Sequence, residues 1–234
     1  MELQNRVAVV TGGSGGIGYA IAEALGGAGA RVVITGRDPD RLSQAALSLR
    51  AHPIQADVTS EEDVRRTWTD TLDEFGQVDI LVNNAGTGLF SNLVDMDREA
   101  FDRVFATNVT GAMLMAREAA RHFVGRNGGN IVNIGSTAGL RGAARGTAYY
   151  ASKFALRGMT ECWRAELRPH NVRVFLINPS EVITEFARKA GFRQPENPTK
   201  LHAEDIAHTV RSVLEMDDRG FTTELTVFAT NPND

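Results

Sequence analysis

The chain has 234 residues, and its 25 lysines and arginines against 29 aspartates and glutamates give a formal net charge of −4. Its 42% hydrophobic and 23% charged residues are typical of a soluble globular protein that buries a core without disulfides or metal ions. The mild acidity indicates neither a nucleic-acid-binding groove nor a membrane-binding surface. The single cysteine, Cys162, excludes an intramolecular disulfide and a cysteine metal cage. The histidines show no metal-ligand spacing, so we expect no metal.

Targeting patterns are also missing from the sequence. A strand-like run begins within a few residues of Met1, with no basic region followed by a long apolar one. No run approaches the roughly 18 uninterrupted apolar residues of a membrane helix. We therefore expect a cytoplasmic protein.

Short apolar runs rich in β-branched residues alternate with helical patterns along the chain. The predicted strands are residues 7–11, 31–35, 52–55, 79–83, 131–134, 173–177 and 224–228. The predicted helices are residues 17–28, 39–50, 61–75, 98–123, 148–168 and 203–215. Runs that are apolar on both faces are typical of parallel strands covered by helices on both sides. This predicts a doubly wound α/β fold, with one Rossmann domain over residues 1–234 and a seven-stranded parallel sheet. Residues 190–200 contain two prolines and little periodicity, which indicates a surface loop or lid.

A glycine-rich turn, Thr-Gly-Gly-Ser-Gly-Gly-Ile-Gly at residues 11–18, joins the first strand to the first helix. Glycine permits this tight turn and brings backbone against a pyrophosphate, to which the helix N-terminus offers free N–H groups. No Gly-Lys-Ser/Thr follows, so the turn is not a P-loop. The context predicts dinucleotide binding through Gly12, Ser14, Gly15, Gly16, Ile17 and Gly18.

The end of the second strand indicates which dinucleotide is bound. An acidic residue there binds the ribose hydroxyls of NAD, whereas an arginine accommodates the 2′-phosphate of NADP. This strand ends Thr35-Gly36-Arg37, which favours NADP(H) over NAD(H). Two alternatives stay open: Arg37 is a solvated loop residue, or Asp38 is the ribose acid displaced by one position.

Further motifs follow the glycine-rich turn in order: Asn-Asn-Ala-Gly at 83–86, Asn108, Ser136, and Tyr149 with Lys153 in Tyr-Tyr-Ala-Ser-Lys. On these residues, nearly the whole chain resembles the short-chain dehydrogenases/reductases, and most closely the 3-oxoacyl-(acyl carrier protein) reductases and similar carbonyl reductases. The resemblance implies that Tyr149 is the acid/base, that Lys153 holds the nicotinamide ribose and that Asn108 organises a proton-relay water. It also implies cofactor contacts from Asp57, Val58, Asn84, Ala85, Gly86, Pro179 and Thr184.

The residue types themselves suit this chemistry. Tyr149 and Lys153 are four residues apart on a predicted helix and share a face. To exchange a proton, a tyrosine with a pKa of about 10 needs a pKa nearer neutrality, and lowering it by ~3 units requires about 4 kcal/mol. A lysine ammonium and a nicotinamide cation are able to stabilise the phenolate by that amount. Ser136 is able to donate a hydrogen bond to a carbonyl oxygen. Tyr150, three residues from Lys153, is the rival to Tyr149.

Two positions depart from the family pattern. Ser180 stands where the family usually has glycine after Pro179, and the usual Asp-Gly-Gly ending is missing. For Asn84, the alternative to a cofactor contact is a structural role, in which its side-chain amide bridges two strands.

The resemblance implies hydride transfer between a nicotinamide and a ketone, aldehyde or secondary alcohol, with a 3-oxoacyl thioester on an acyl carrier as one such substrate. It further implies a homodimer or homotetramer. The expected pocket wall consists of Leu89, Phe90, Ala138, Leu140 and residues 185–200, with Arg141 and Arg145 at its mouth. Four arginines are expected either to form a docking patch for an acidic carrier or to belong to a solvated or dimer-contact face: Arg117, Arg121, Arg126 and Arg168. The alternative is a catalytically silent nucleotide-binding regulator or scaffold, because a fold does not determine function.

Overall fold

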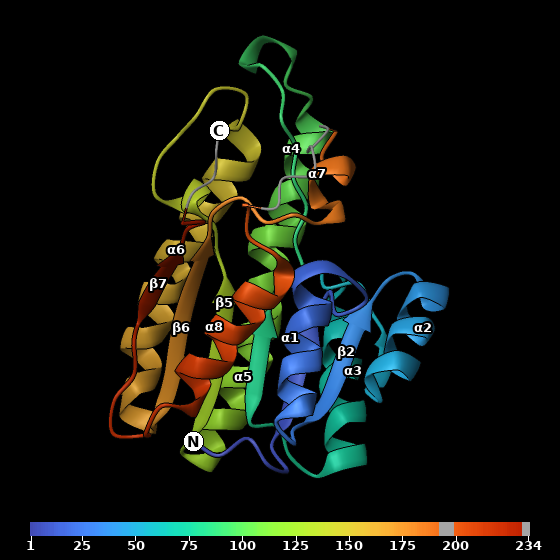
Figure 1. Ribbon diagram of the computed structural model, residues 1–234, viewed down its shortest axis with the longest axis vertical. Helices are drawn as coiled ribbons and strands as arrows, with labels where there is room; N and C mark the ends of the chain where they lie inside the picture. The colour runs from blue at the N-terminus through green and yellow to red at the C-terminus, as the bar shows by residue number, and fades with distance from the viewer. Residues whose placement is uncertain (192–198, 231–234) are drawn as a thin grey trace.

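Seven parallel strands form one sheet in the computed structural model, which describes residues 1–191 and 199–230 (Figure 1). The strand order is β3-β2-β1-β4-β5-β6-β7. The strands are β1 (Val7–Thr11), β2 (Arg31–Gly36), β3 (His52–Gln55), β4 (Ile80–Asn83), β5 (Gly129–Ile134), β6 (Val172–Pro179) and β7 (Glu224–Val227). The predicted doubly wound α/β fold is confirmed. The largest difference lies in β6, which continues to Pro179 because it pairs with β7 as far as Val227.

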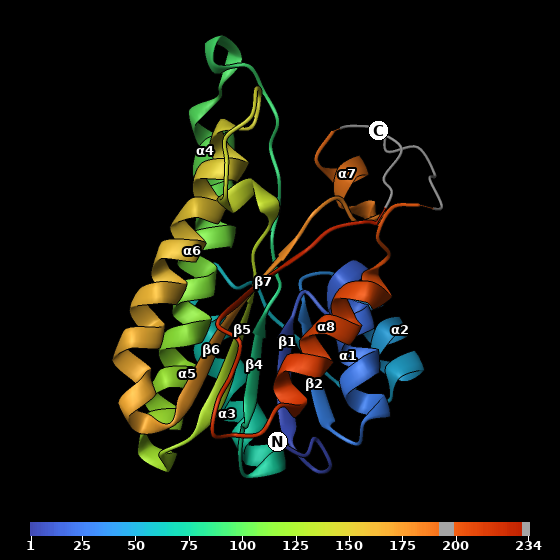
Figure 2. The same cartoon turned by 60° about the vertical axis from the view of Figure 1, so that its left-hand side comes forward.

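Helices cover both faces of the sheet, as Figure 2 shows. On one face lie α1 (Gly16–Gly27), α2 (Pro39–Leu49) and α8 (Ala203–Glu215). On the other lie α3 (Glu61–Phe75), α5 (Ala112–Arg126) and α6 (Thr147–Leu167). Successive side chains of a strand point to opposite faces, so Ala8 and Val10 enter one apolar core and Val9 enters the other.

The predicted helix over residues 98–123 contains an irregular segment. Helix α4 (Arg98–Phe105) is followed by a π-helical turn (Ala106–Gly111) and then directly by α5. A π-helical turn holds more residues than an α-helical one and often occurs at functional sites. This turn carries Asn108.

Residues 185–200, part of the expected pocket wall, begin with a short helix, α7 (Glu185–Lys189), just before the predicted loop. Thr184 caps it, because its Oγ1 accepts a hydrogen bond from the backbone N–H of Phe186 at 3.3 Å. The rest of the predicted loop or lid falls largely on residues 192–198, which lie outside the described residues. Short 3₁₀ turns cover Leu93–Asp95, Thr137–Gly139 and Arg168–His170.

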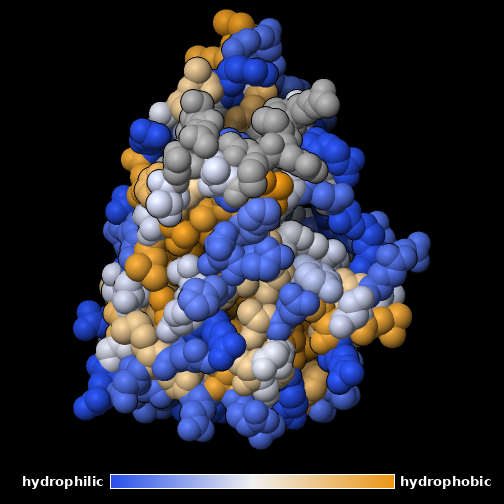
Figure 3. Space-filling model, viewed as in Figure 1, coloured by the Kyte–Doolittle hydropathy of each residue, from blue (hydrophilic) through white to orange (hydrophobic). Residues whose placement is uncertain are grey.

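The surface shown in Figure 3 is mainly hydrophilic, with hydrophobic residues gathered in smaller groups between the polar ones. Within residues 1–191 and 199–230, no helix combines the length and apolar character needed to cross a membrane. The same residues contain no group of three or more histidine, cysteine, aspartate or glutamate side chains arranged to hold a metal ion.

Candidate active site

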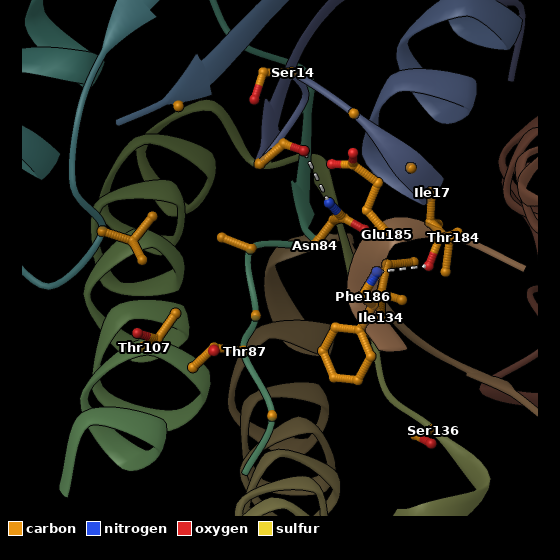
Figure 4. Close-up of a pocket in the computed structure, with 18 of the residues that line it drawn as sticks. Ser14, Ile17, Asn84, Thr87, Thr107, Ile134, Ser136, Thr184, Glu185 and Phe186 are labelled. Carbon is orange, nitrogen blue, oxygen red and sulfur yellow. Dashed lines mark hydrogen bonds between the residues drawn. The ribbon is translucent and has the colours of Figure 1, made fainter. Parts of the chain in front are cut away.

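A cavity of about 350 Å³ lies at the carboxyl ends of the parallel strands (Figure 4). Ligands of open α/β sheets bind at this edge, where the strand order reverses. Sixteen predicted site residues line the cavity: Gly12, Ser14, Gly15, Gly16, Ile17, Arg37, Asp57, Val58, Asn84, Ala85, Gly86, Ser136, Tyr149, Lys153, Pro179 and Thr184. Gly18 and Asn108 do not line it.

The glycine-rich turn presents backbone to the cavity. Gly12 and Gly16 have positive φ angles of 66° and 55°, which glycine adopts without steric cost. Helix α1 then begins with no side-chain cap and no acidic residue in its first turn. Its first N–H groups and positive dipole end therefore suit an anion such as a pyrophosphate.

Gly18 has a packing role one turn into α1. A Cβ at this position would lie 2.4 Å from the carbonyl oxygen of Gly12 and 2.4 Å from the side-chain nitrogen of Asn84. Only glycine therefore lets the helix approach the turn this closely.

Asn84 connects β4 to β1. Its Nδ2 donates to the carbonyl oxygen of Thr11 at 2.9 Å, while Thr11 Oγ1 accepts the backbone N–H groups of Asn84 and Ala85 at 3.0 Å each. These bonds match the bridging alternative for Asn84. They hold the segment after β4 against the glycine-rich turn.

Arginines gather where β2 ends. Arg37 is exposed, and its Nη1 lies 3.8 Å from Asp57 Oδ2. Asp38 caps α2 by accepting the N–H groups of Asp40 and Arg41, and it does not line the cavity. The structure therefore supports a capping role for Asp38 rather than a ribose contact.

Arg41 lines the cavity too, although it was not among the residues predicted from the sequence. Its Nη2 lies 2.8 Å from Glu185 Oε2 on α7. The available signal was its place in the first turn of the helix after β2, four residues beyond Arg37.

Ser136, Tyr149 and Lys153 come together from β5 and α6. Lys153 Nζ donates to the carbonyl oxygen of Ile134 at 2.8 Å and lies 5.8 Å from the centroid of the Tyr149 ring. Ser136 Oγ accepts the N–H of Ala138 at 3.1 Å. A tyrosine, a serine hydroxyl and a buried ammonium thus share one cavity with the glycine-rich turn.

Burial shifts the pKa values of both Tyr149 and Lys153. Desolvation raises the pKa of Tyr149 to about 12, although a hydrogen bond with Ser136 acts to lower it. Burial also lowers the pKa of Lys153 to about 8. Among the protein's own groups, the loss of water around the phenol therefore outweighs the interactions that lower its pKa. The predicted lowering invoked the charge of a bound nicotinamide as well as that of Lys153.

Asn108 lies outside the cavity and is buried behind it. Its Oδ1 accepts the N–H of Thr87 at 2.8 Å, and its Nδ2 donates to Thr87 O and to Ser152 Oγ, each at 2.9 Å. Ser152 Oγ in turn donates to the carbonyl oxygen of Tyr149 at 2.7 Å. The polar atoms of Asn108 thus connect the segment after β4 to α6. Ser152 was missed, although it belongs to the Tyr-Tyr-Ala-Ser-Lys motif.

Aromatic side chains enclose the Tyr149 ring. Its centroid lies 5.5 Å from that of Phe90, 5.4 Å from that of Phe186 and 6.2 Å from that of Tyr150. Phe186 lines the cavity, which the sequence did not single out. Six residues that were expected in the pocket wall or at its mouth do not line the cavity: Leu89, Phe90, Ala138, Leu140, Arg141 and Arg145.

The four arginines expected to form one docking patch divide into two groups. Arg117 and Arg121 are ion-paired with Glu118, and Arg117 also with Glu61. Arg126 and Arg168 instead line a second cavity, of about 690 Å³, at the opposite end of the sheet. A continuous basic patch is therefore not formed by these side chains.

Comparison with known proteins identifies the family. The family model described as short chain dehydrogenase matches residues 6–194. An uncharacterised oxidoreductase of Staphylococcus saprophyticus is 35% identical over 233 residues, covering 97% of this chain and 98% of the relative. A metagenomic short-chain oxidoreductase in complex with NADP has a TM-score of 0.85 at 34% identity, covering 97% of this chain and 98% of that one. A 3-ketoacyl-(acyl-carrier-protein) reductase of Brucella melitensis complexed with NADH has a TM-score of 0.91 at 29% identity, covering 98% and 99%. The chain therefore belongs to the short-chain dehydrogenase family of oxidoreductases.

Proposed function

We propose that the protein is an NADP(H)-dependent oxidoreductase that interconverts a ketone or aldehyde and a secondary alcohol. The observation that carries the proposal is the shared cavity, where Ser136, Tyr149 and Lys153 lie beside an uncapped glycine-rich helix start. Nothing in the site favours the alternative of a catalytically silent regulator.

The residues at the cavity suit a dinucleotide along its length. The free N–H groups at the start of α1 would hold the pyrophosphate, and Arg37 the 2′-phosphate. Lys153 would hold the nicotinamide ribose. The remaining contacts would come from Asp57, Val58, Asn84, Ala85, Gly86, Pro179 and Thr184. When bound, the nicotinamide supplies or accepts the hydride.

The choice of NADP(H) depends on charge at the end of β2. Arg37 and Arg41 both line the cavity there, and a guanidinium is well suited to bind phosphate. The similar solved structures do not separate the two nucleotides, since one is a complex with NADP and another with NADH.

Tyr149 and Ser136 act on the substrate oxygen. In the reducing direction, the Tyr149 phenol donates its proton to the carbonyl oxygen while the carbonyl carbon gains the hydride. Ser136 donates a hydrogen bond to the same oxygen and stabilises its developing negative charge. A pKa of about 12 keeps the phenol protonated at neutral pH, which suits an acid. The nearby Lys153 ammonium favours the phenolate that remains. Oxidation of the alcohol reverses these proton transfers.

The substrate class follows from the walls around Tyr149. Phe186, which lines the cavity, packs against its ring, and this supports a substrate with an apolar portion next to the carbonyl. A 3-oxoacyl thioester fits this description, and the similarity to the Brucella reductase supports it.

A homodimer or homotetramer through α5 and α6 is supported by exposed Val124 and Phe154.

The test follows the loss of reduced-nicotinamide absorbance with NADPH and NADH in parallel, each with acetoacetyl thioester. We expect turnover with NADPH and little with NADH. Replacement of Tyr149 (Tyr149→Phe) should lower turnover about 100- to 10,000-fold and leave the Kd for NADPH unchanged. The matched control is Tyr150→Phe, which removes a neighbouring hydroxyl and should keep turnover near wild type. A Tyr149→Phe variant with the wild-type rate would overturn the mechanism, and fast turnover with NADH would overturn the role of Arg37.

A further inference from the structure

An ion pair crosses the candidate active site from one side to the other. Arg41 on α2 and Glu185 on α7 are 144 residues apart in sequence, and their Nη2 and Oε2 atoms lie 2.8 Å apart. Both residues line the cavity, and Figure 4 shows the Glu185 side chain extending into it. The pair therefore links the adenosine side of the proposed cofactor site to the helix that covers the substrate side.

The pair lies directly over the glycine-rich turn. A Cβ on Gly15 would lie 3.2 Å from Arg41 Nη2, and one on Gly16 would lie 3.6 Å from the Thr184 side chain. The Arg41 guanidinium is thus held beside the backbone that the proposed pyrophosphate approaches, and it is ion-paired there with the Glu185 carboxylate.

Glu185 is not bound to Arg41 alone. Its Oε1 lies 3.1 Å from Arg188 Nη2 on the same helix. If Arg41 is drawn to another anion, the Glu185 carboxylate keeps a cationic partner. Exchange of partners at Arg41 therefore does not leave an isolated charge.

A phosphate monoester competes well for such a guanidinium. It carries up to two negative charges and three acceptor oxygens, whereas a carboxylate carries one charge and two oxygens. Arginine binds both groups through paired N–H donors. A phosphate at the end of β2 would therefore attract Arg41 and would be repelled by Glu185.

We propose that Glu185 is a specificity-determining residue for the nucleotide: it holds Arg41 when no 2′-phosphate is present and opposes the 2′-phosphate when one binds. Arg41 is then a second cation for the 2′-phosphate, beside Arg37. NADH leaves the Arg41–Glu185 pair intact, whereas NADPH exchanges the carboxylate for phosphate. The inference depends on the NADP(H) function proposed above.

The test measures the Kd of the full-length protein for NADPH and for NADH by titration calorimetry, without substrate. For Glu185→Gln we expect NADPH to bind about two- to fivefold more tightly, the size expected when a partly exposed ion pair no longer competes, while the Kd for NADH, which carries only the pyrophosphate, changes less. For Arg41→Ala we expect binding of NADPH about tenfold weaker, again with a smaller change for NADH. In the double variant, Glu185→Gln should improve NADPH binding less than it does alone, because it then removes only the repulsion of the phosphate and no longer the competition for Arg41.

The matched control is Glu215→Gln on α8. Glu215 pairs with Arg211 at 2.9 Å with side-chain exposures of 45% for Arg211 and 41% for Glu215, close to the 41% and 51% of Arg41 and Glu185. It removes the same charge away from the cavity and should change neither Kd.

The outcomes separate the two proposals. A Glu185→Gln variant that changes both Kd values equally, or no more than Glu215→Gln, overturns the inference while a wild-type preference for NADPH keeps the proposed function. A wild-type protein that binds neither nucleotide overturns both.

Discussion

Lys153 carries a buried charge whose cost to folding is measurable. The residue is 7% exposed, and burial lowers its pKa from 10.5 to about 8. Below pH 8 the folded protein must hold a charge that the unfolded chain holds more easily, which costs about 3 kcal/mol at pH 7. Between pH 8 and pH 10.5 the unfolded chain binds more protons than the folded one, so stability rises with pH. At pH 10 the remaining cost is about 1 kcal/mol.

The substitution Lys153→Met removes this charge and keeps an unbranched side chain. It also leaves the carbonyl oxygen of Ile134 without its donor, but that loss is the same at every pH. We therefore expect the free energy of unfolding of the variant, relative to wild type, to fall by about 2 kcal/mol between pH 7 and pH 10.

Urea unfolding of both proteins at the two pH values provides the measurement, and other titrating groups cancel in the difference between variant and wild type. The same difference at pH 7 and pH 10 would refute the lowered pKa of Lys153. A difference that grew with pH would refute even its direction.

Two further substitutions test separate parts of the site. Ser136→Ala should lower kcat by about 100-fold in the NADPH assay, because it removes a donor to the developing oxyanion; an unchanged kcat would exclude that contact. Gly18→Ala should lower the free energy of unfolding by about 1–3 kcal/mol, since the new Cβ would meet Gly12 and Asn84 at 2.4 Å. Gly27→Ala in the same helix is its control, because no atom lies within 4 Å of the added Cβ and alanine favours helix by about 1 kcal/mol. Equal effects in thermal or urea unfolding would contradict the packing role of Gly18.

The sheet was predictable because its signal is local. β1 and β4 are buried at every position, and such runs, separated by helical patterns, leave few alternatives to a parallel sheet. The end of β6 was not predictable in this way. The predicted strand stops at residue 177, yet Asn178 Nδ2 donates to Glu224 Oε1 at 2.8 Å and Pro179 pairs with Val227. These partners lie more than 40 residues away.

The same distinction, between local sequence patterns and contacts of distant segments, applies to the candidate site. The glycine-rich turn and the Tyr149–Lys153 spacing are short patterns, and the structure brings both to one cavity. Arg41, Glu185 and Phe186 carry no such pattern, since each depends on a contact between distant segments. The raised pKa of Tyr149 likewise depends on burial, which spacing along a helix does not determine.

The first strand of the chain lies in the interior of the sheet. Val9 of β1 pairs with Val33 of β2 on one side and with Leu81 of β4 on the other. During synthesis, the β4 side of this apolar strand therefore stays without its partner until about 70 more residues have been made. Contacts of this sequence separation slow folding, and an unpaired apolar edge is prone to aggregation. We expect the β1–β4 pair to form in a slow step of folding, so that the glycine-rich turn at the middle of the sheet reaches its final position only in that step.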